Sequence, residues 1–137
     1  MADCLFCDAV AGKLDVFAVY ESDQVFAFLD HRPVFKGHVL VVPKVHVEVL
    51  ADLPHTDVGP YFLDVQRIAI AVETGLGAAG TFVALNNKVS QSVPHLHTHV
   101  VPRTKGDGLR GFFWPRTRYA SPAEATEYAD KIKSELT

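Results

Sequence analysis

The residues that decide the fold are Ser90-Gln91-Ser92-Val93-Pro94-His95-Leu96-His97-Thr98-His99-Val100-Val101-Pro102-Arg103. The three histidines alternate with other residues, and this period of two predicts a β-strand over residues 94–101. On a strand, residues two apart project from the same face, about 6.6 Å from one another. We therefore expect His95, His97 and His99 to form a row of imidazoles on one surface, with Thr98 facing away.

Such a row is costly to bury without partners or a function, so scattered core histidines are a poor explanation. One functional interpretation is a metal site, because His-x-His on a strand often presents two ring nitrogens to zinc or iron. The other is a phosphate site. Neutral donors suited to phosphoryl oxygens precede the row, at Asn86, Ser90, Gln91 and Ser92. They favour phosphate, since a catalytic metal site would more naturally bring a carboxylate ligand there.

The remaining strands are predicted by alternation and by β-branched residues. Two alternating segments flank the turn 21–24 and predict a β-hairpin. A β-branched run follows and ends at Pro43. The expected strands are 17–20, 25–29, 38–42, 81–85 and 94–101. Together they predict an antiparallel sheet of about five strands.

Two helices are expected. Apolar residues at three- and four-residue steps predict one long helix over 53–76, ended by Gly75 and Gly77. Ser121-Pro122-Ala123-Glu124 resembles a helix start and predicts a C-terminal helix. Strands clustered around one long helix indicate an α+β fold rather than alternating βαβ units. At 137 residues, we expect a single domain over 1–137.

Composition excludes several classes of protein. With 13 Lys+Arg against 16 Asp+Glu, the formal charge is −3, and no basic cluster could follow a long nucleic acid. The amino terminus is acidic where a signal peptide would be basic, and no apolar run approaches the ~18 residues of a membrane span. We expect a cytoplasmic protein with neither a membrane nor a long nucleic acid as partner.

Cys4 and Cys7 are the only cysteines, and their C-x2-C spacing favours metal binding or redox exchange over a disulfide framework. A tetrahedral zinc would need two further ligands. A thioredoxin-like redox pair is less favoured, because that motif sits between a strand and a helix and no strand precedes it here. Two buried thiols without a role are the remaining alternative.

With these motifs together, the chain resembles the histidine triad (HIT) family. The family pattern is His-φ-His-φ-His-φ-φ with apolar φ, often preceded by Gly-Gln-Ser/Thr-Val. Thr98 stands here in place of an apolar residue, and Ser90 in place of the glycine that lets an amide approach phosphate closely. Further segments follow in the family's order: Cys4–Cys7, Tyr20–Asp23, Ala27–Asp30 and Gly37–His46.

The resemblance implies a HIT-like fold, a homodimer that pairs two sheets, and the activities of Hint-like and Fhit-like proteins. Their substrates are adenosine 5′-phosphoramidates or dinucleoside polyphosphates. It implies that His97 attacks the α-phosphorus and forms a covalent nucleotidyl-histidine, which water then hydrolyses. His38 and His99 would flank the phosphate, and His95 completes the catalytic set. The resemblance does not identify the general acid.

The resemblance also implies a binding site for a purine nucleotide or another nucleoside phosphate derivative. Asp30 would accept the ribose hydroxyls, although a turn aspartate fits the local sequence equally well. Gln91 and Ser92 would position the phosphate or leaving group, and Asn86 would orient His97 or the substrate. Residues expected around the base are Leu5, Phe6, Phe28, Leu29, His31 and Leu40, which could equally be core residues. Trp114-Pro115 would reach a neighbouring subunit's active site or cap its own core.

For the cysteine pair, the resemblance implies a structural zinc held by Cys4, Cys7, His46 and His95, with no metal required for the chemistry. Two other functions stay open at this point. The chain could be a metal-dependent hydrolase that uses the histidine row as ligands. It could also be a nucleotide-binding scaffold protein whose role is to bind a protein partner.

Overall fold

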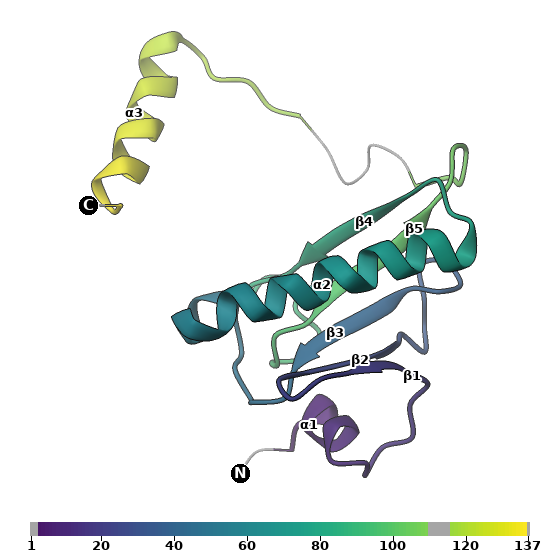
Figure 1. The fold of residues 1–137 in the computed structure, drawn as a ribbon. Helices are drawn as coiled ribbons and strands as arrows, with labels where there is room; N and C mark the ends of the chain where they lie inside the picture. The colour runs from purple at the N-terminus through teal and green to yellow at the C-terminus, as the bar shows by residue number, and fades with distance from the viewer. Residues whose placement is uncertain (1–2, 110–115, 137) are drawn as a thin grey trace. The chain divides into compact units, whose positions relative to one another are not determined.

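The computed structural model describes residues 3–109 and 116–136. Residue contacts divide the chain into two units, 1–105 and 106–137. The first unit holds a five-stranded antiparallel sheet in the order β1-β2-β3-β5-β4 (Figure 1). Its elements are α1 (Leu5–Val10), β1 (Ala18–Glu21), β2 (Val25–Leu29), β3 (Val39–Pro43), the short 3-10 helix η1 (Leu50–Asp52), α2 (His55–Leu76), β4 (Gly80–Leu85) and β5 (Thr98–Arg103).

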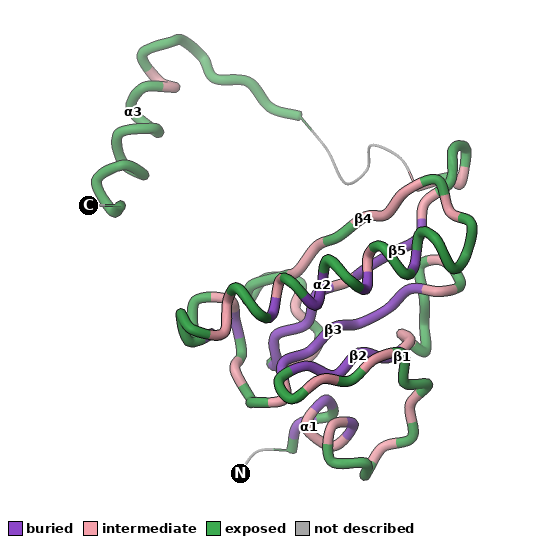
Figure 2. Tube along the Cα trace, viewed as in Figure 1, coloured by how far each residue is buried: buried purple, intermediate pink, exposed green. Residues whose placement is uncertain are grey.

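The two faces of the sheet carry separate apolar clusters, because side chains alternate along each strand. Val25 and Ala27 of β2 pack with Ile68 and other residues of α2 on one face. Phe26 and Phe28 pack on the other face with Phe6 of α1. The central strands β2, β3 and β5 are the most buried, whereas β1 and β4 are edge strands (Figure 2). The sheet is therefore covered by α2 on one side and locally by α1 on the other.

The predicted α+β class, the five antiparallel strands and the long helix are confirmed. The strand expected over 94–101 is wrong at its start, because β5 begins at Thr98. β3 pairs with β5 only from Thr98 to Val100, so the ladder does not reach His95 or His97. The backbone N–H of Leu96 instead donates to the carbonyl of Val47 at 2.7 Å. Two histidines of the expected row thus lie in a loop before the strand.

The second unit contains α3 (Pro122–Ser134), which confirms the C-terminal helix. Ser121 Oγ accepts from the backbone N–H of Glu124 at 3.1 Å, and Glu124 Oε1 accepts from the backbone N–H of Ala120 at 2.8 Å. The first bond is the one that the predicted capping motif requires. The second reaches the N–H of Ala120, one residue before the cap residue Ser121. Trp114 and Pro115 lie outside the described residues, and the single domain over 1–137 stays a prediction. In the described part of the chain, no helix has both the length and the apolar character needed to cross a bilayer.

Candidate functional site

A cavity of about 440 Å³ lies in the first unit, on the face of the sheet that α1 covers. Its wall is mostly apolar, and polar side chains interrupt it where the strands end. Ten of the predicted site residues line it: Leu5, Phe6, Phe28, Leu29, Asp30, His31, Leu40, Ser92, His97 and His99. The cavity therefore combines a slot for a flat apolar group with a cluster of hydrogen-bonding groups.

The sequence did not single out five further lining residues: Leu14, Asp15, Val16, Phe17 and Val93. Four of them belong to the irregular segment between α1 and β1. Phe17 was expected to begin a strand, but β1 begins at Ala18, so alternation did not reveal which of these side chains face inward. Val93 could have been inferred, because it follows Ser92 directly in the family motif. No motif in the sequence indicated that Asp15, which carries a carboxyl group, lines the cavity.

His97 is held in one orientation by its neighbours. It is only 3% exposed, and the Phe6 ring meets it edge to face with ring centres 5.0 Å apart. Its Nδ1 lies 2.7 Å from the carbonyl oxygen of His95. Since a carbonyl oxygen only accepts, Nδ1 carries the ring proton, and the neutral ring keeps its lone pair on Nε2.

His38 is placed by a tight turn that ends just before β3. Gly37 has φ +99°, a backbone conformation that residues with a Cβ rarely adopt, so this position favours glycine. His38 Nδ1 accepts from the backbone N–H of Val34 at 3.1 Å. The ring proton of neutral His38 therefore lies on Nε2, which donates to His99 Nδ1 at 2.9 Å. This bond leaves the Nε2–H of His99 available as a donor.

The pair is neutral at pH 7. Burial, and after it the nearby His97 and His38, lower the pKa of His99 to about 4 against the opposing effect of Asp30. Burial also lowers the pKa of His38. His38 does not line the cavity but lies behind His99, whereas the resemblance placed both beside the phosphate.

Asp30 is a turn aspartate whose side chain also reaches the cavity. Its Oδ1 accepts from the backbone N–H of Arg32 at 2.9 Å, as expected of a turn aspartate. Its Oδ2 lies 3.7 Å from His38 Nε2. The same side chain lines the cavity, so a carboxylate is present there to accept hydroxyl donors.

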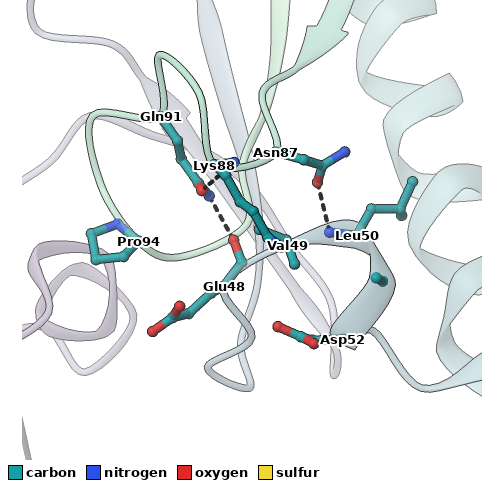
Figure 3. Close-up of a pocket in the computed structure, with 9 residues that line it drawn as sticks. Glu48, Val49, Leu50, Asp52, Asn87, Lys88, Gln91 and Pro94 are labelled. Carbon is teal, nitrogen blue, oxygen red and sulfur yellow. Dashed lines mark hydrogen bonds between the residues drawn. The ribbon is translucent and has the colours of Figure 1, made fainter.

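Two predicted site residues, Asn86 and Gln91, do not line the cavity. Asn86 Nδ2 donates to the carbonyl of Ser90 at 3.2 Å. Gln91 points into a different pocket, where its Nε2 donates to the carbonyl of Glu48 at 2.6 Å (Figure 3). The predicted set of phosphate donors is therefore divided, and only Ser92 of these lines the cavity.

The predicted zinc ligands Cys4, Cys7, His46 and His95 converge, with ligand atoms within 4.8 Å of one another. His95 Nδ1 lies 3.3 Å from Cys4 Sγ and 3.5 Å from Cys7 Sγ, and His46 Nδ1 lies 3.3 Å from Cys7 Sγ. A tetrahedral zinc separates sulfur and nitrogen ligands by about 3.6 Å, so the spacing fits. His95 Nε2 donates to the carbonyl of Pro43 at 2.8 Å, which directs the Nδ1 lone pair at the sulfurs.

The three histidines of the row do not share one metal site. His95 belongs to the cysteine group, and His99 groups with Asp30 and His38. His97 belongs to neither of these candidate metal groups, which are the ones found within the described residues. The arrangement thus separates His95 from His97 and His99, whose ring centres lie 5.1 Å apart and which both line the cavity.

The fold and the closely spaced histidines define a histidine triad protein. The chain belongs to the HIT family, because the model of the HIT domain matches residues 11–106. It is 41% identical over 115 residues to "Protein hit" of Bacillus subtilis, a match that covers 82% of this chain and 79% of that protein. Members of the family bind nucleotides and are generally nucleotide hydrolases or transferases.

Two further relatives bear on the chemistry. A protein of Arabidopsis thaliana named adenylylsulfatase HINT3 is 31% identical over 109 residues, which are 78% of this chain and 55% of that protein. A solved structure described as a Zn-bound histidine triad family protein from Mycobacterium smegmatis is 35% identical. That match covers 96% of each chain, with a TM-score of 0.74.

Proposed function

We propose that this chain hydrolyses or transfers nucleotides by attack of His97 Nε2 on the α-phosphorus of nucleoside phosphoramidates or dinucleoside polyphosphates. The observation that carries the proposal is the 2.7 Å hydrogen bond from His97 Nδ1 to the His95 carbonyl. It fixes a proton on Nδ1, so that the neutral tautomer presents its lone pair on Nε2, in a protein whose cavity this histidine lines. No separate base is needed to activate such a nucleophile.

In the first step a bond forms between Nε2 and phosphorus, and the bond from phosphorus to the leaving group breaks. The leaving group departs with the electron pair and takes up a proton from solvent, and the water that attacks in the second step returns one proton to solvent. The nucleotidylated ring becomes cationic, and the His95 carbonyl, which still accepts from Nδ1, stabilises that charge. Water then cleaves the N–P bond, which releases the nucleoside monophosphate and restores neutral His97.

The other lining residues supply the remaining contacts in this proposal. His99 donates its Nε2–H, and Ser92 its hydroxyl, to phosphoryl oxygens. Asp30 accepts the ribose hydroxyls. The slot between Leu5, Phe6, Phe28, Leu29, His31 and Leu40 encloses the base, and its apolar area suits a purine.

We also propose a structural zinc at Cys4, Cys7, His46 and His95. The donor set fits, because two thiols and two imidazole nitrogens within 4.8 Å are the ligands that zinc prefers. Burial and the neighbouring Cys4 raise the pKa of the Cys7 thiol to about 11, so a cation is needed to hold it as thiolate at neutral pH. When bound, the ion supplies a cross-link and leaves His97 free for chemistry.

A homodimer that pairs two sheets completes the proposal. β4 is an edge strand whose outer side pairs with no described strand. Val83 of β4 and Leu63 and Ile70 of α2 are large apolar residues with exposed side chains. Such residues beside an open edge support association with a second copy, which sedimentation equilibrium would measure.

The test uses purified protein with a panel of phosphoramidate, dinucleoside polyphosphate and nucleotidyl-sulfate substrates. Mass spectrometry of the peptide that contains His97 detects a trapped nucleotidyl group. We expect His97→Ala and His97→Gly to lower turnover at least about 10³-fold while nucleoside monophosphate still binds. His55→Ala is the matched control, because His55 is an exposed residue at the start of α2, remote in sequence from the motif.

Unchanged hydrolysis by the His97 variants would overturn the proposal. Activity that disappears with a chelator and returns with metal would favour a metal-dependent hydrolase, for which the group Asp30, His38 and His99 is the remaining candidate. Tight nucleotide binding with negligible turnover across the panel would favour a scaffold protein.

A further inference from the structure

The loop that leads into the histidine segment adopts an unfavourable backbone conformation. Lys88 has φ 73° and Ser90 has φ 62°, and neither residue is glycine. Left-handed backbone is costly for residues with a Cβ, so it persists only where other contacts hold the chain in place. Gln91 and Ser92 follow directly. The side chain of Ser92 lines the cavity that contains His97, whereas the side chain of Gln91 lines a different pocket.

Gln91 makes two hydrogen bonds that hold this loop (Figure 3). Its Oε1 accepts from the backbone N–H of Lys88 at 3.1 Å, which closes the turn. Its Nε2 donates to the carbonyl of Glu48 at 2.6 Å, which ties the loop to a distant segment. Both the oxygen and the nitrogen of the side-chain amide therefore make a hydrogen bond.

The segment 47–50 holds the loop at further points on either side of Gln91. Asn87 Oδ1 accepts from the backbone N–H of Leu50 at 2.9 Å (Figure 3). Beyond Gln91, the backbone N–H of Leu96 donates to the carbonyl of Val47 at 2.7 Å. Ser92 and Val93 thus lie on a short span of chain that is fixed at both ends.

The segment is itself firmly placed, so it can serve as an anchor. Val49 is buried, and η1 follows directly and leads to the buried Leu53 of the core. His46, just before the segment, contacts Cys7 and the His95 ring. The loop is therefore attached to the body of the sheet unit.

We infer that Gln91 is a positioning residue that acts through Ser92. By fixing the turn at Lys88 and the distance to Glu48, it sets where the Ser92 hydroxyl meets the phosphate. The inference rests on the proposed function, since it concerns the rate of that reaction. It differs from a direct contact between Gln91 and the phosphate or leaving group, because the Gln91 side chain lines another pocket.

Displacement of a reacting or positioning group by about 1 Å can cost about 10²-fold in rate. We expect Gln91→Ala to lower kcat about 10- to 100-fold and to change KM less than about threefold. Gln91→Glu keeps an acceptor for Lys88 but turns a carboxylate toward the Glu48 carbonyl, so its kcat should fall similarly. Val89→Ala, an exposed residue of the same loop, is the matched control and should keep the wild-type kcat.

The decisive measurement is a double-mutant cycle with Ser92→Ala. If Gln91 acts through Ser92, Gln91→Ala should lower kcat less than about threefold in the Ser92→Ala background. An equal fall in both backgrounds, or a wild-type kcat in Gln91→Glu, overturns the inference.

Hydrogen exchange of the backbone amides over 86–92 tests, without any turnover, whether Gln91 holds the loop. The Lys88 amide should exchange faster in Gln91→Ala but stay protected in Gln91→Glu and Val89→Ala. If the Lys88 amide stays protected in Gln91→Ala, Gln91 does not hold the loop and the inference is overturned, even if the wild-type protein turns over every substrate. Absence of turnover in the wild-type protein contradicts the proposed function, whereas the exchange result still decides whether Gln91 holds the loop.

Discussion

His99 shows how much of the site depends on single hydrogen bonds. The backbone N–H of Val34 determines the tautomer of His38, and His38 in turn determines the tautomer of His99. The sequence predicted that these histidines would lie together, but it could not predict which ring nitrogen of each carries the proton. The position of these protons depends on a backbone amide in the irregular segment before Gly37, which carries no motif.

The pKa of His99 predicts how stability depends on pH. An ordinary histidine titrates near 6.5, whereas burial lowers the pKa of His99 to about 4 in the folded protein. Between these values the unfolded chain binds a proton that the folded chain does not, so the free energy of unfolding rises with pH across this window. Above pH 6.5 the full stability is present. Acidification to pH 4 should remove about 2 kcal/mol, because the partial exposure of His99 screens part of the roughly 3 kcal/mol that the pKa shift alone implies.

Urea denaturation at steps between pH 4.5 and 7.5 measures this slope. His99→Gln cannot titrate and should show a shallower slope, whereas His55→Gln, a change at an exposed histidine, should keep the wild-type slope. Comparison with the wild type cancels the contributions of the titratable groups that do not interact with His99. A slope in His99→Gln equal to that of the wild type would contradict the expectation.

At the scale of elements, the contact between α2 and the sheet explains the departure at Thr98 from the family's apolar pattern. Thr98 is fully buried, and its Oγ1 lies 2.7 Å from the hydroxyl of Tyr61 on α2. The Tyr61 hydroxyl also donates to the carbonyl of Val41 on β3 at 2.8 Å. A buried threonine is therefore satisfied here, and the three groups connect α2 with β3 and β5.

We expect Tyr61→Phe to lower the free energy of unfolding by about 1–2 kcal/mol, because the Thr98 hydroxyl loses its partner in a buried site. Thr98→Val should cost about 1 kcal/mol for the corresponding reason. The double variant should cost less than the sum of the two, since it removes both polar partners of one bond. Thermal and urea unfolding measure all three, and strict additivity would show that the two hydroxyls do not interact.

Periodicity predicted the elements that are long or strictly alternating, such as α2 and the β1–β2 hairpin. It failed where the chain is short or held by distant contacts. The six residues of α1 are too few for a recognisable helical pattern. His95 and His97 alternate like a strand, but their segment is drawn toward Val47 and the cysteines. The motif predicted that His97 and His99 belong to the candidate site, whereas the orientation of their rings depends on contacts that no motif describes.

At the scale of the molecule, the cysteine and histidine cluster connects parts of the chain that are far apart in sequence. Cys4 and His95 are separated by 91 residues, and their side chains lie 3.3 Å apart. His46 adds the segment that anchors the loop before His97. A zinc ion there would fix the amino terminus, the 46–50 segment and the histidine segment to one another, and would do so more firmly than the hydrogen bonds alone.

The zinc proposal predicts one ion per chain by elemental analysis, and a lower unfolding temperature after chelation. Binding to the folded state alone stabilises it, and a loss of a few kcal/mol corresponds to about 10 °C in a chain of this size. Cys7→Ser should weaken zinc binding and lower the unfolding temperature even without a chelator, while His55→Ala should leave both unchanged. Because His97 is not among the ligands, turnover below the unfolding temperature should survive chelation. A protein that is purified with zinc present and contains none, or whose unfolding temperature a chelator leaves unchanged, would contradict the proposal and leave the cluster as a set of hydrogen-bonded thiols and imidazoles.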